Sequence, residues 1–241
     1  MKESLVFQLY APLASWGEAA AGEIRHSAAV PTRSALLGLV AAALGIRRDE
    51  EERLNTFNQH YHLAVHALAS QERWLRDYPT VSAPRENKKY RYFTRRDELT
   101  LAPDEIGTLI SQREYRCDGY WHVALSATAG APYALTALRE ALLTPYFPLY
   151  LGRKSCPLAL PLAPRLMTGT LKEIFILAAQ EMSAAELNGF TSKEGICYWD
   201  DPDEKSLQWQ QKIHSHNNPL SRQRWQFGSY IRFSGLLQGR A

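Results

Sequence analysis

Cations and aromatic rings alternate in one short segment, residues 85–96. Six cations face a single acid, Glu86, and they are Arg85, Lys88, Lys89, Arg91, Arg95 and Arg96. The aromatic residues between them are Tyr90, Tyr92 and Phe93. Lysine and arginine neutralise phosphates, while aromatic rings and guanidinium planes stack on unpaired bases. The segment therefore predicts contact with nucleic acid, and a solvated hairpin whose rings pack on the body is the alternative.

Two further segments have the composition of an anion site. In the run from Tyr150 to Pro157, Gly152 would let backbone amides approach an anion, and two cations and a hydroxyl follow it as Arg153, Lys154 and Ser155. The run is not a P-loop, because the first glycine and the strand-to-helix context are missing. In the other segment, Arg33 and Ser34 stand at a predicted helix N-terminus, where free amides favour a phosphate. An ordinary turn and an ordinary helix start are the alternatives.

The sequence predicts neither a metal site nor a cofactor. His60 and His62 alternate, as do His214 and His216, but no carboxylate or cysteine follows at a familiar metal-binding spacing. No dinucleotide fingerprint and no serine-hydrolase or zinc-protease motif is found. The three cysteines are odd in number and about forty residues apart, which is typical of a reducing cytoplasm rather than of a disulfide framework.

The elements that must position these residues follow one another as strand, helix, strand, basic insertion, strand and helix. The apolar run 4–10 predicts a buried strand that Pro12 ends, and 32–45 predicts a helix with Thr32 as N-cap and Gly45 at its end. Strands are expected at 63–68 and 121–127, and a helix follows Pro132. This order is typical of an α+β fold with a ferredoxin-like split βαβ unit. Beyond residue 160 the pattern predicts only a strand at 225–233 and a capping box at Ser183 and Glu186.

Composition indicates a globular chain of one elaborated domain. Of its 241 residues, 45% are hydrophobic and 22% are charged, which excludes disordered, collagen-like and coiled-coil classes. The longest apolar stretch, 35–46, is shorter than the ~20 residues that span a bilayer. No signal peptide is recognised, so we expect a cytoplasmic protein that does not enter a membrane.

Several short motifs together resemble one family. They are Trp16-Gly17, Pro31 to Ser34 with its continuation 36–39, Leu44-Gly45-Ile46, Arg76-Asp77-Tyr78, Arg113-Glu114-Tyr115 with Cys117-Asp118, and Tyr150 to Leu158; beyond residue 160 only Arg224-Trp225 matches. The chain resembles the CasD family, the subunits of the type I-E CRISPR surveillance complex (Cascade) that cap the 5′ end of the guide RNA.

The resemblance implies a fold, a function and a set of RNA-binding residues. The family belongs to the RAMP superfamily, so residues 1–160 are expected to form an RRM-like core with a long basic β-hairpin, the thumb, at about 78–113. Residues 161–241 would be a C-terminal extension packed on the same domain, or a second, degenerate RRM-like unit. The pocket for the crRNA handle would draw on Trp16, Arg33, Ser34, Gly152, Arg153, Lys154 and Ser155. Arg113 and Tyr150 would also bind RNA. The thumb would add the six cations and Tyr90.

The resemblance also implies partners and leaves one alternative activity. The partners would be the crRNA, the backbone subunit and the large subunit that reads the protospacer-adjacent motif, with target DNA reached indirectly through the thumb. The alternative to this non-catalytic role is an endoribonuclease that processes precursor crRNA without a metal. It needs a base and an acid at the cleaved phosphodiester, and Tyr150, Lys154 and His122 are the candidates.

Overall fold

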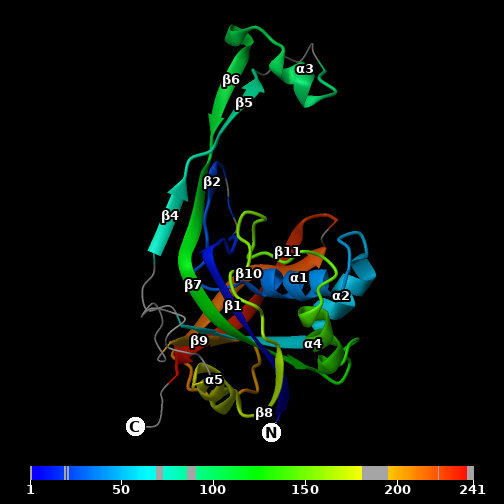
Figure 1. Ribbon diagram of the computed structural model, residues 1–241, viewed down its shortest axis with the longest axis vertical. Helices are drawn as coiled ribbons and strands as arrows, with labels where there is room; N and C mark the ends of the chain where they lie inside the picture. The colour runs from blue at the N-terminus through cyan, green and yellow to red at the C-terminus, as the bar shows by residue number, and fades with distance from the viewer. Residues whose placement is uncertain are drawn as a thin grey trace.

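The body of the molecule is a long sheet covered by helices, and a narrow arm projects from it (Figure 1). A computed structural model describes residues 2–18, 20, 22–68, 73–85, 91–180, 195–221 and 223–237. The strands are β1 (Lys2–Ala14), β2 (Ile24–Arg25), β3 (Tyr61–Ala67), β4 (Arg73–Asp77), β5 (Thr80–Pro84), β6 (Ile106–Ile110), β7 (Gln112–Ala127), β8 (Arg165–Gly169), β9 (Ile196–Trp199), β10 (Gln211–Ser221) and β11 (Gln226–Leu236). The helices are α1 (Arg33–Ala43), α2 (Glu51–Gln59), α3 (Arg95–Leu99), α4 (Leu135–Leu143) and α5 (Leu171–Gln180), with a 3-10 turn at Pro103–Glu105.

The sheet of the body is almost entirely antiparallel. Its strands lie in the order β10-β11-β9-β3-β7-β1-β8, and β2 and β4 pair with the free half of β7. β1 lies between β7 and β8, with Leu5 opposite both Leu125 and Leu166. Only the short β2 runs parallel to its neighbour. The fold is therefore a sheet-rich α+β fold, as the element order predicts.

Strand β1 is buried on both faces, which explains its continuous apolar sequence. Leu5 and Phe7 pack into the core under α1 and α4, whereas Val6 packs into a second core under α5. The strand does not end at Pro12, as the sequence predicted, but continues to Ala14. Pro12 is exposed and pairing resumes beyond it at Leu13, so the missing N–H is tolerated.

The two predicted helices are confirmed, with one shifted start. Thr32 caps α1, since its hydroxyl accepts a hydrogen bond from the Ala35 amide at 3.3 Å. Gly45 follows the end of α1 at a φ of +75°, the left-handed conformation that glycine adopts freely. Helix α4 begins at Leu135 with Ala134 as N-cap, later than the predicted first turn at Pro132.

The C-terminal part of the chain adds strands that the sequence predicted only in part. The strand expected at 225–233 is confirmed as β11, while β8, α5 and β9 were not predicted. The capping box at Ser183 and Glu186 lies outside the described residues. The predicted strand 121–127 is confirmed, but it is only the C-terminal half of β7, which is 16 residues long.

The arm is built on the N-terminal half of β7. β4 pairs with residues 113–117 of β7 at the foot of the arm, and β5 and β6 form a separate antiparallel hairpin beyond it. The tip is not a simple hairpin, because α3 stands there with a capping box between Thr94 and Asp97. Lys88, Lys89 and Tyr90 lie outside the described residues. Across the parts of the chain that are described, no helix has the length and apolar character needed to span a membrane.

Candidate nucleic-acid interface

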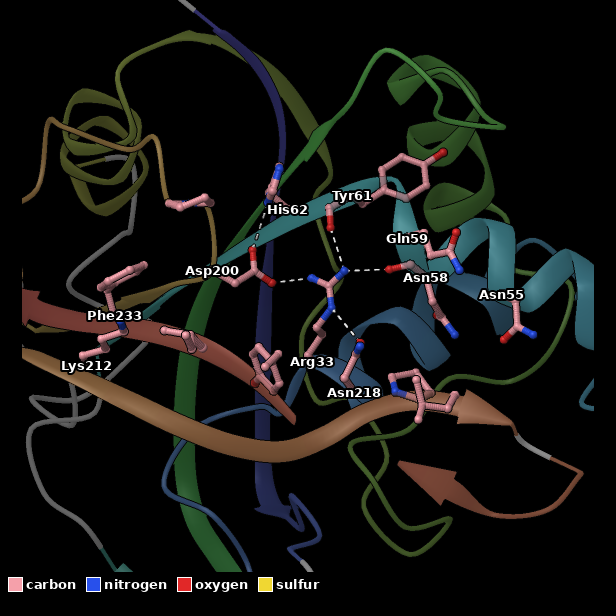
Figure 2. Close-up of a pocket in the computed structure, with 15 residues that line it drawn as sticks. Arg33, Asn55, Asn58, Gln59, Tyr61, His62, Asp200, Lys212, Asn218 and Phe233 are labelled. Atoms are coloured by element: carbon pink, nitrogen blue, oxygen red, sulfur yellow. Dashed lines mark hydrogen bonds and ion pairs between the residues drawn. The ribbon is translucent and has the colours of Figure 1, made fainter. Parts of the chain in front are cut away.

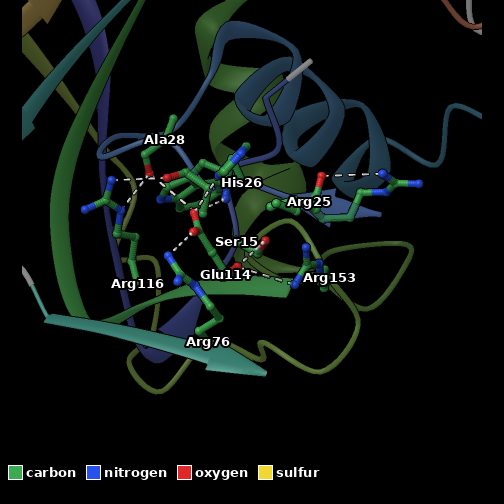
Figure 3. Close-up of polar contacts among 11 residues, drawn as sticks. Ser15, Arg25, His26, Ala28, Arg76, Glu114, Arg116 and Arg153 are labelled. Atoms are coloured by element: carbon green, nitrogen blue, oxygen red, sulfur yellow. Dashed lines mark hydrogen bonds and ion pairs between the residues drawn. The ribbon is translucent and has the colours of Figure 1, made fainter. Parts of the chain in front are cut away.

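A buried carboxylate, Glu114, gathers basic side chains at the foot of the arm (Figure 3). The register of β4 and β7 places Arg76 opposite Glu114, and the Arg76 guanidinium donates to its Oε1 at 3.0 Å. His26 lies 3.1 Å from the other carboxylate oxygen through Nδ1. The Glu114 side chain is only 4% exposed, whereas those of Arg76 and His26 are about half exposed (53% and 49%). One buried anion thus fixes two basic groups at the surface.

The charge of Glu114 is maintained by these contacts. Burial acts to raise the pKa of its carboxyl group, but hydrogen bonds from His26 and Arg76 outweigh that effect and lower the pKa below its usual value. The pKa of Arg76 is raised, first by its hydrogen bond with Glu114 and then by Tyr78. Both groups therefore remain charged at neutral pH.

The loop 150–157 meets the foot of the arm at the same residue. The Arg153 guanidinium lies 4.6 Å from the centre of the Tyr115 ring, and it donates to the Glu114 carbonyl at 3.4 Å. Lys154 and Ser155 follow on the exposed side of the loop, and Tyr150 is half-buried. The structure therefore brings the loop 150–157 against the segment 113–115, which the sequence had proposed from two distant motifs, and Arg113 and Lys154 are both exposed.

Gly152 has a different role from the one expected of it. Its φ is +87°, and a Cβ at this position would lie 1.7 Å from the Ser15 carbonyl oxygen. The Ser15 amide donates to the Leu151 carbonyl at 3.0 Å, which holds the loop against the end of β1. The Gly152 amide itself donates to the Tyr150 carbonyl at 3.1 Å. The glycine thus permits close approach of two backbone segments, and its amide is already engaged.

Arg33 is occupied inside the protein, contrary to the prediction that it contacts RNA (Figure 2). Its guanidinium forms an ion pair with Asp200 and donates to the carbonyls of Asn58 at 2.7 Å and Tyr61 at 2.9 Å. The Asn218 amide oxygen accepts a further hydrogen bond at 3.3 Å. The side chain is 11% exposed, at the wall of a cavity of about 620 Å³ between α2 and β10–β11. Arg33 therefore attaches α1 to the C-terminal strands.

The other two residues of the predicted pocket, Trp16 and Ser34, also have side chains that pack within the protein. Trp16 is 1% exposed and packs edge-on against Trp121, with ring centres 5.3 Å apart, so its ring has no access to a ligand in this conformation. Ser34 is half-buried, and its hydroxyl lies 3.3 Å from that of Thr32. The predicted pocket of Trp16, Arg33 and Ser34 is not formed by their side chains.

The residues considered for RNA cleavage are not brought together. His122 lies on the face of the sheet under α5, next to Tyr120 and His66. The loop 150–157 packs its Leu151 on the opposite face, and Glu114, which that loop touches, is eight residues or roughly 27 Å along β7 from His122. Burial is the main cause that lowers the pKa of His122 to about 3. The set of Tyr150, Lys154 and His122 therefore has no common centre.

The cations of the described arm lie beyond the foot, and the same segment carries the acidic residues Asp97, Glu98, Asp104 and Glu105. Arg85, Arg91 and Arg96 are exposed, and Arg95 pairs with Glu98 and donates to the Ser82 carbonyl.

Sequence reasoning had not selected Arg76 or His26 as site residues. The motif Arg76-Asp77-Tyr78 carried the available signal for Arg76, and in the structure Arg76 and Asp77 pair with Glu114 and Arg113. Within the described ranges, no group of three His, Cys, Asp or Glu side chains could hold a metal ion.

Comparison with known proteins adds three findings. A family model described as CRISPR-associated protein (Cas_Cas5) matches residues 4–232. The CRISPR system Cascade subunit CasD of Escherichia coli (strain K12) is 37% identical over 169 residues, which cover 67% of this chain and 70% of that protein. Among solved structures, a chain of a CRISPR RNA-guided surveillance complex is similar with a TM-score of 0.64 at 20% identity, covering 97% of this chain and 88% of that one. A crystal structure of a Cas protein is similar with a TM-score of 0.55, also at 20% identity, covering 97% and 94% of the two chains.

Proposed function

Because the chain belongs to the CRISPR-associated Cas5 family, we propose that it is a non-catalytic subunit of a type I-E surveillance complex that binds the 5′ handle of the guide RNA. The observation that carries this proposal is the basic cluster around Glu114. Arg76 from β4 donates to the Glu114 carboxylate, and Arg153 from the loop 150–157 donates to the Glu114 backbone carbonyl. Two exposed cations, Arg113 and Lys154, are the chain neighbours of Glu114 and Arg153. Several cations around one buried carboxylate leave a positive surface, which suits the phosphates of a single strand.

The proposal assigns roles to the body and the arm. The strand order β8-β1-β7-β3, with α1 and α4 on one face, supports a ferredoxin-like RAMP core, and β9–β11 extend the same sheet. In this proposal the arm, residues 78–111, is the thumb, and its cations contact the guide where handle meets spacer. The handle itself lies along the foot of the arm. The protein partners are the backbone subunit and the large subunit of the complex, and target DNA is reached indirectly through the thumb.

A binding experiment tests the role of the cluster. The full chain is titrated onto a fluorescent single-stranded RNA that carries the handle, at several salt concentrations. Arg153→Ala with Lys154→Ala removes two proposed phosphate contacts, so the slope of log affinity against log salt should flatten by about 1.4. Arg48→Ala with Lys205→Ala is the matched control, because it removes one arginine and one lysine that are exposed elsewhere. Equal loss in both double variants would overturn the proposed site.

The arm is tested separately with Arg91→Ala and Arg96→Ala. Arg95 is left unchanged because it holds the arm through Ser82. We expect this variant to retain handle binding and to lose assembly of the complex or binding of target DNA. Loss of handle binding equal to that of the Arg153 and Lys154 variant would refute the division between foot and arm.

Precursor RNA distinguishes the proposal from the endoribonuclease alternative. The wild-type chain is incubated with precursor and product lengths are measured separately from binding. We expect intact precursor, because Tyr150, Lys154 and His122, the candidates for base and acid, have no common centre. Site-specific cleavage by wild type that disappears on Lys154→Ala would contradict the proposal.

A further inference from the structure

Trp74 stands half exposed on β4, with one face of its ring held by a buried cation. It is 49% exposed, and the register of β4 and β7 places it opposite Arg116. The Arg116 guanidinium carbon lies 3.5 Å from the centre of the indole ring. Arg116 is only 7% exposed, so this contact is sheltered from water on the side of the guanidinium. The Arg116 guanidinium therefore covers one face of the indole ring, and the other face is open to solvent.

The Arg116 guanidinium is held rigidly because it is hydrogen-bonded to the backbone of a separate segment. Its Nε donates to the Ala28 carbonyl at 3.1 Å, and its Nη2 donates to the Ser27 carbonyl at 3.1 Å (Figure 3). These bonds fix the plane of the guanidinium and hence the plane of the indole stacked on it. A ring that is oriented in advance loses little further freedom when a second flat group stacks on it.

Trp74 also lies beside the phosphate-binding cluster. Arg76 is two residues further along β4, so both side chains leave the same face of the strand, about 7 Å apart at their Cα atoms. The Arg76 guanidinium is held by Glu114 and remains about half exposed. An open aromatic face next to an anchored cation matches one nucleotide, whose base offers a flat surface and whose phosphate offers a charge.

We propose that Trp74 is a stacking platform for one unpaired base of the bound RNA, and that Arg76 contacts the phosphate of the same or the adjacent nucleotide. This inference rests on the proposed function and adds a specific base contact that the basic cluster alone does not require. A protein partner on this face is disfavoured because a half-exposed cation, Arg76, leaves the same face of the strand as the ring. Stacking of this kind tolerates any base, so the contact adds affinity and position rather than sequence selectivity.

The test uses the full chain, a short single-stranded RNA and a matched series of that RNA in which each base in turn is removed. Trp74→Leu keeps an apolar cover over Arg116 but offers no aromatic face, and it should weaken binding about tenfold. Its salt slope should equal that of wild type, because no phosphate contact is lost. Trp74→Phe should restore most of the affinity. Trp225→Leu, at a tryptophan of the same chain that is more exposed than Trp74 (61% against 49%), is the control and should bind as wild type.

The base-removal series identifies the stacked nucleotide. With the wild-type protein, removal of the base at one RNA position should reduce affinity about as much as Trp74→Leu does. With the Trp74→Leu protein, removal of the same base should cause no further loss of affinity. The inference is overturned if Trp74→Leu binds as wild type, or if the losses add in full at every position. Unchanged RNA binding with loss of a protein subunit would assign the face to a protein and refute a base contact. Wild type that binds the RNA no better than the Arg153 and Lys154 double variant would instead refute the proposed function.

Discussion

Two buried histidines predict that the fold loses about 4 kcal/mol of stability between about pH 7.5 and about pH 5. His66 and His122 are 0% and 2% exposed, with ring centres 6.4 Å apart beneath α5. Burial lowers the pKa of His66 to about 4; burial first, and then the nearby His66 and Arg165, lower the pKa of His122 to about 3. Among the described residues, neither ring nitrogen of His66 has a hydrogen-bond partner.

The magnitude follows from the difference between folded and unfolded pKa values. An unfolded histidine titrates near pH 6.5, so at about pH 5 the unfolded chain binds a proton on each imidazole that the folded chain excludes. Stability is therefore greatest above pH 6.5 and is lost as the pH falls toward the folded values. Over 1.5 pH units, at about 1.36 kcal/mol per unit, each histidine costs about 2 kcal/mol.

Urea unfolding at a series of pH values measures this loss. The double variant His66→Gln with His122→Gln should show a nearly flat dependence between about pH 7.5 and about pH 5, whatever its absolute stability. His214→Gln, at an exposed position, should retain the wild-type slope. The reasoning fails if wild type and the double variant lose the same free energy over this range.

Three further outcomes follow from the structure. Gly152→Ala should lower the free energy of unfolding by more than about 2 kcal/mol, because the added Cβ would clash with the Ser15 carbonyl. Gly22→Ala is the control, since Gly22 has a φ of +77° and open space around it, and it should cost about 1 kcal/mol. Equal losses of the two variants in thermal unfolding would show that the Ser15 clash adds nothing. Arg33→Met should cost about 3–5 kcal/mol in urea unfolding by leaving Asp200 buried without its partner, and Asp200→Leu added to it should recover part of the loss; no recovery would contradict the ion pair's role. Chelator treatment should leave RNA binding unchanged, and a stoichiometric metal in the purified chain would disprove that expectation.

The sequence predicted elements whose signals are local. The apolar run of β1 and the cap of α1 at Thr32 each depend on neighbouring residues, and both are confirmed. The N-terminal half of β7 was missed because it carries Arg113, Glu114 and Arg116, charged residues that a strand pattern does not accept. The burial of Glu114 and Arg116 becomes favourable only through partners on other segments.

Site residues were hardest to predict where distant partners decide their role. Arg33 has the composition of a phosphate ligand, but Asp200, 167 residues away, occupies it. The Trp16 ring is likewise packed against Trp121 in the core, where it is not accessible to a ligand. By contrast, the prediction for Arg153 and Lys154 came from composition alone, and their loop lies at the surface with no acidic side chain of the described residues paired with them.

The shared strand β7 has a consequence for how this molecule can vary among relatives. Its C-terminal half is locked between β1 and β3, so the register of Glu114 and Arg116 at the foot is inherited from the core. An inserted or deleted residue there would shift the register by one and move every side chain of the foot to the opposite face of the sheet. The hairpin beyond Ser111 is a separate sheet and carries no such constraint. The arm can therefore change in length and charge while the strand pairing at the foot stays the same.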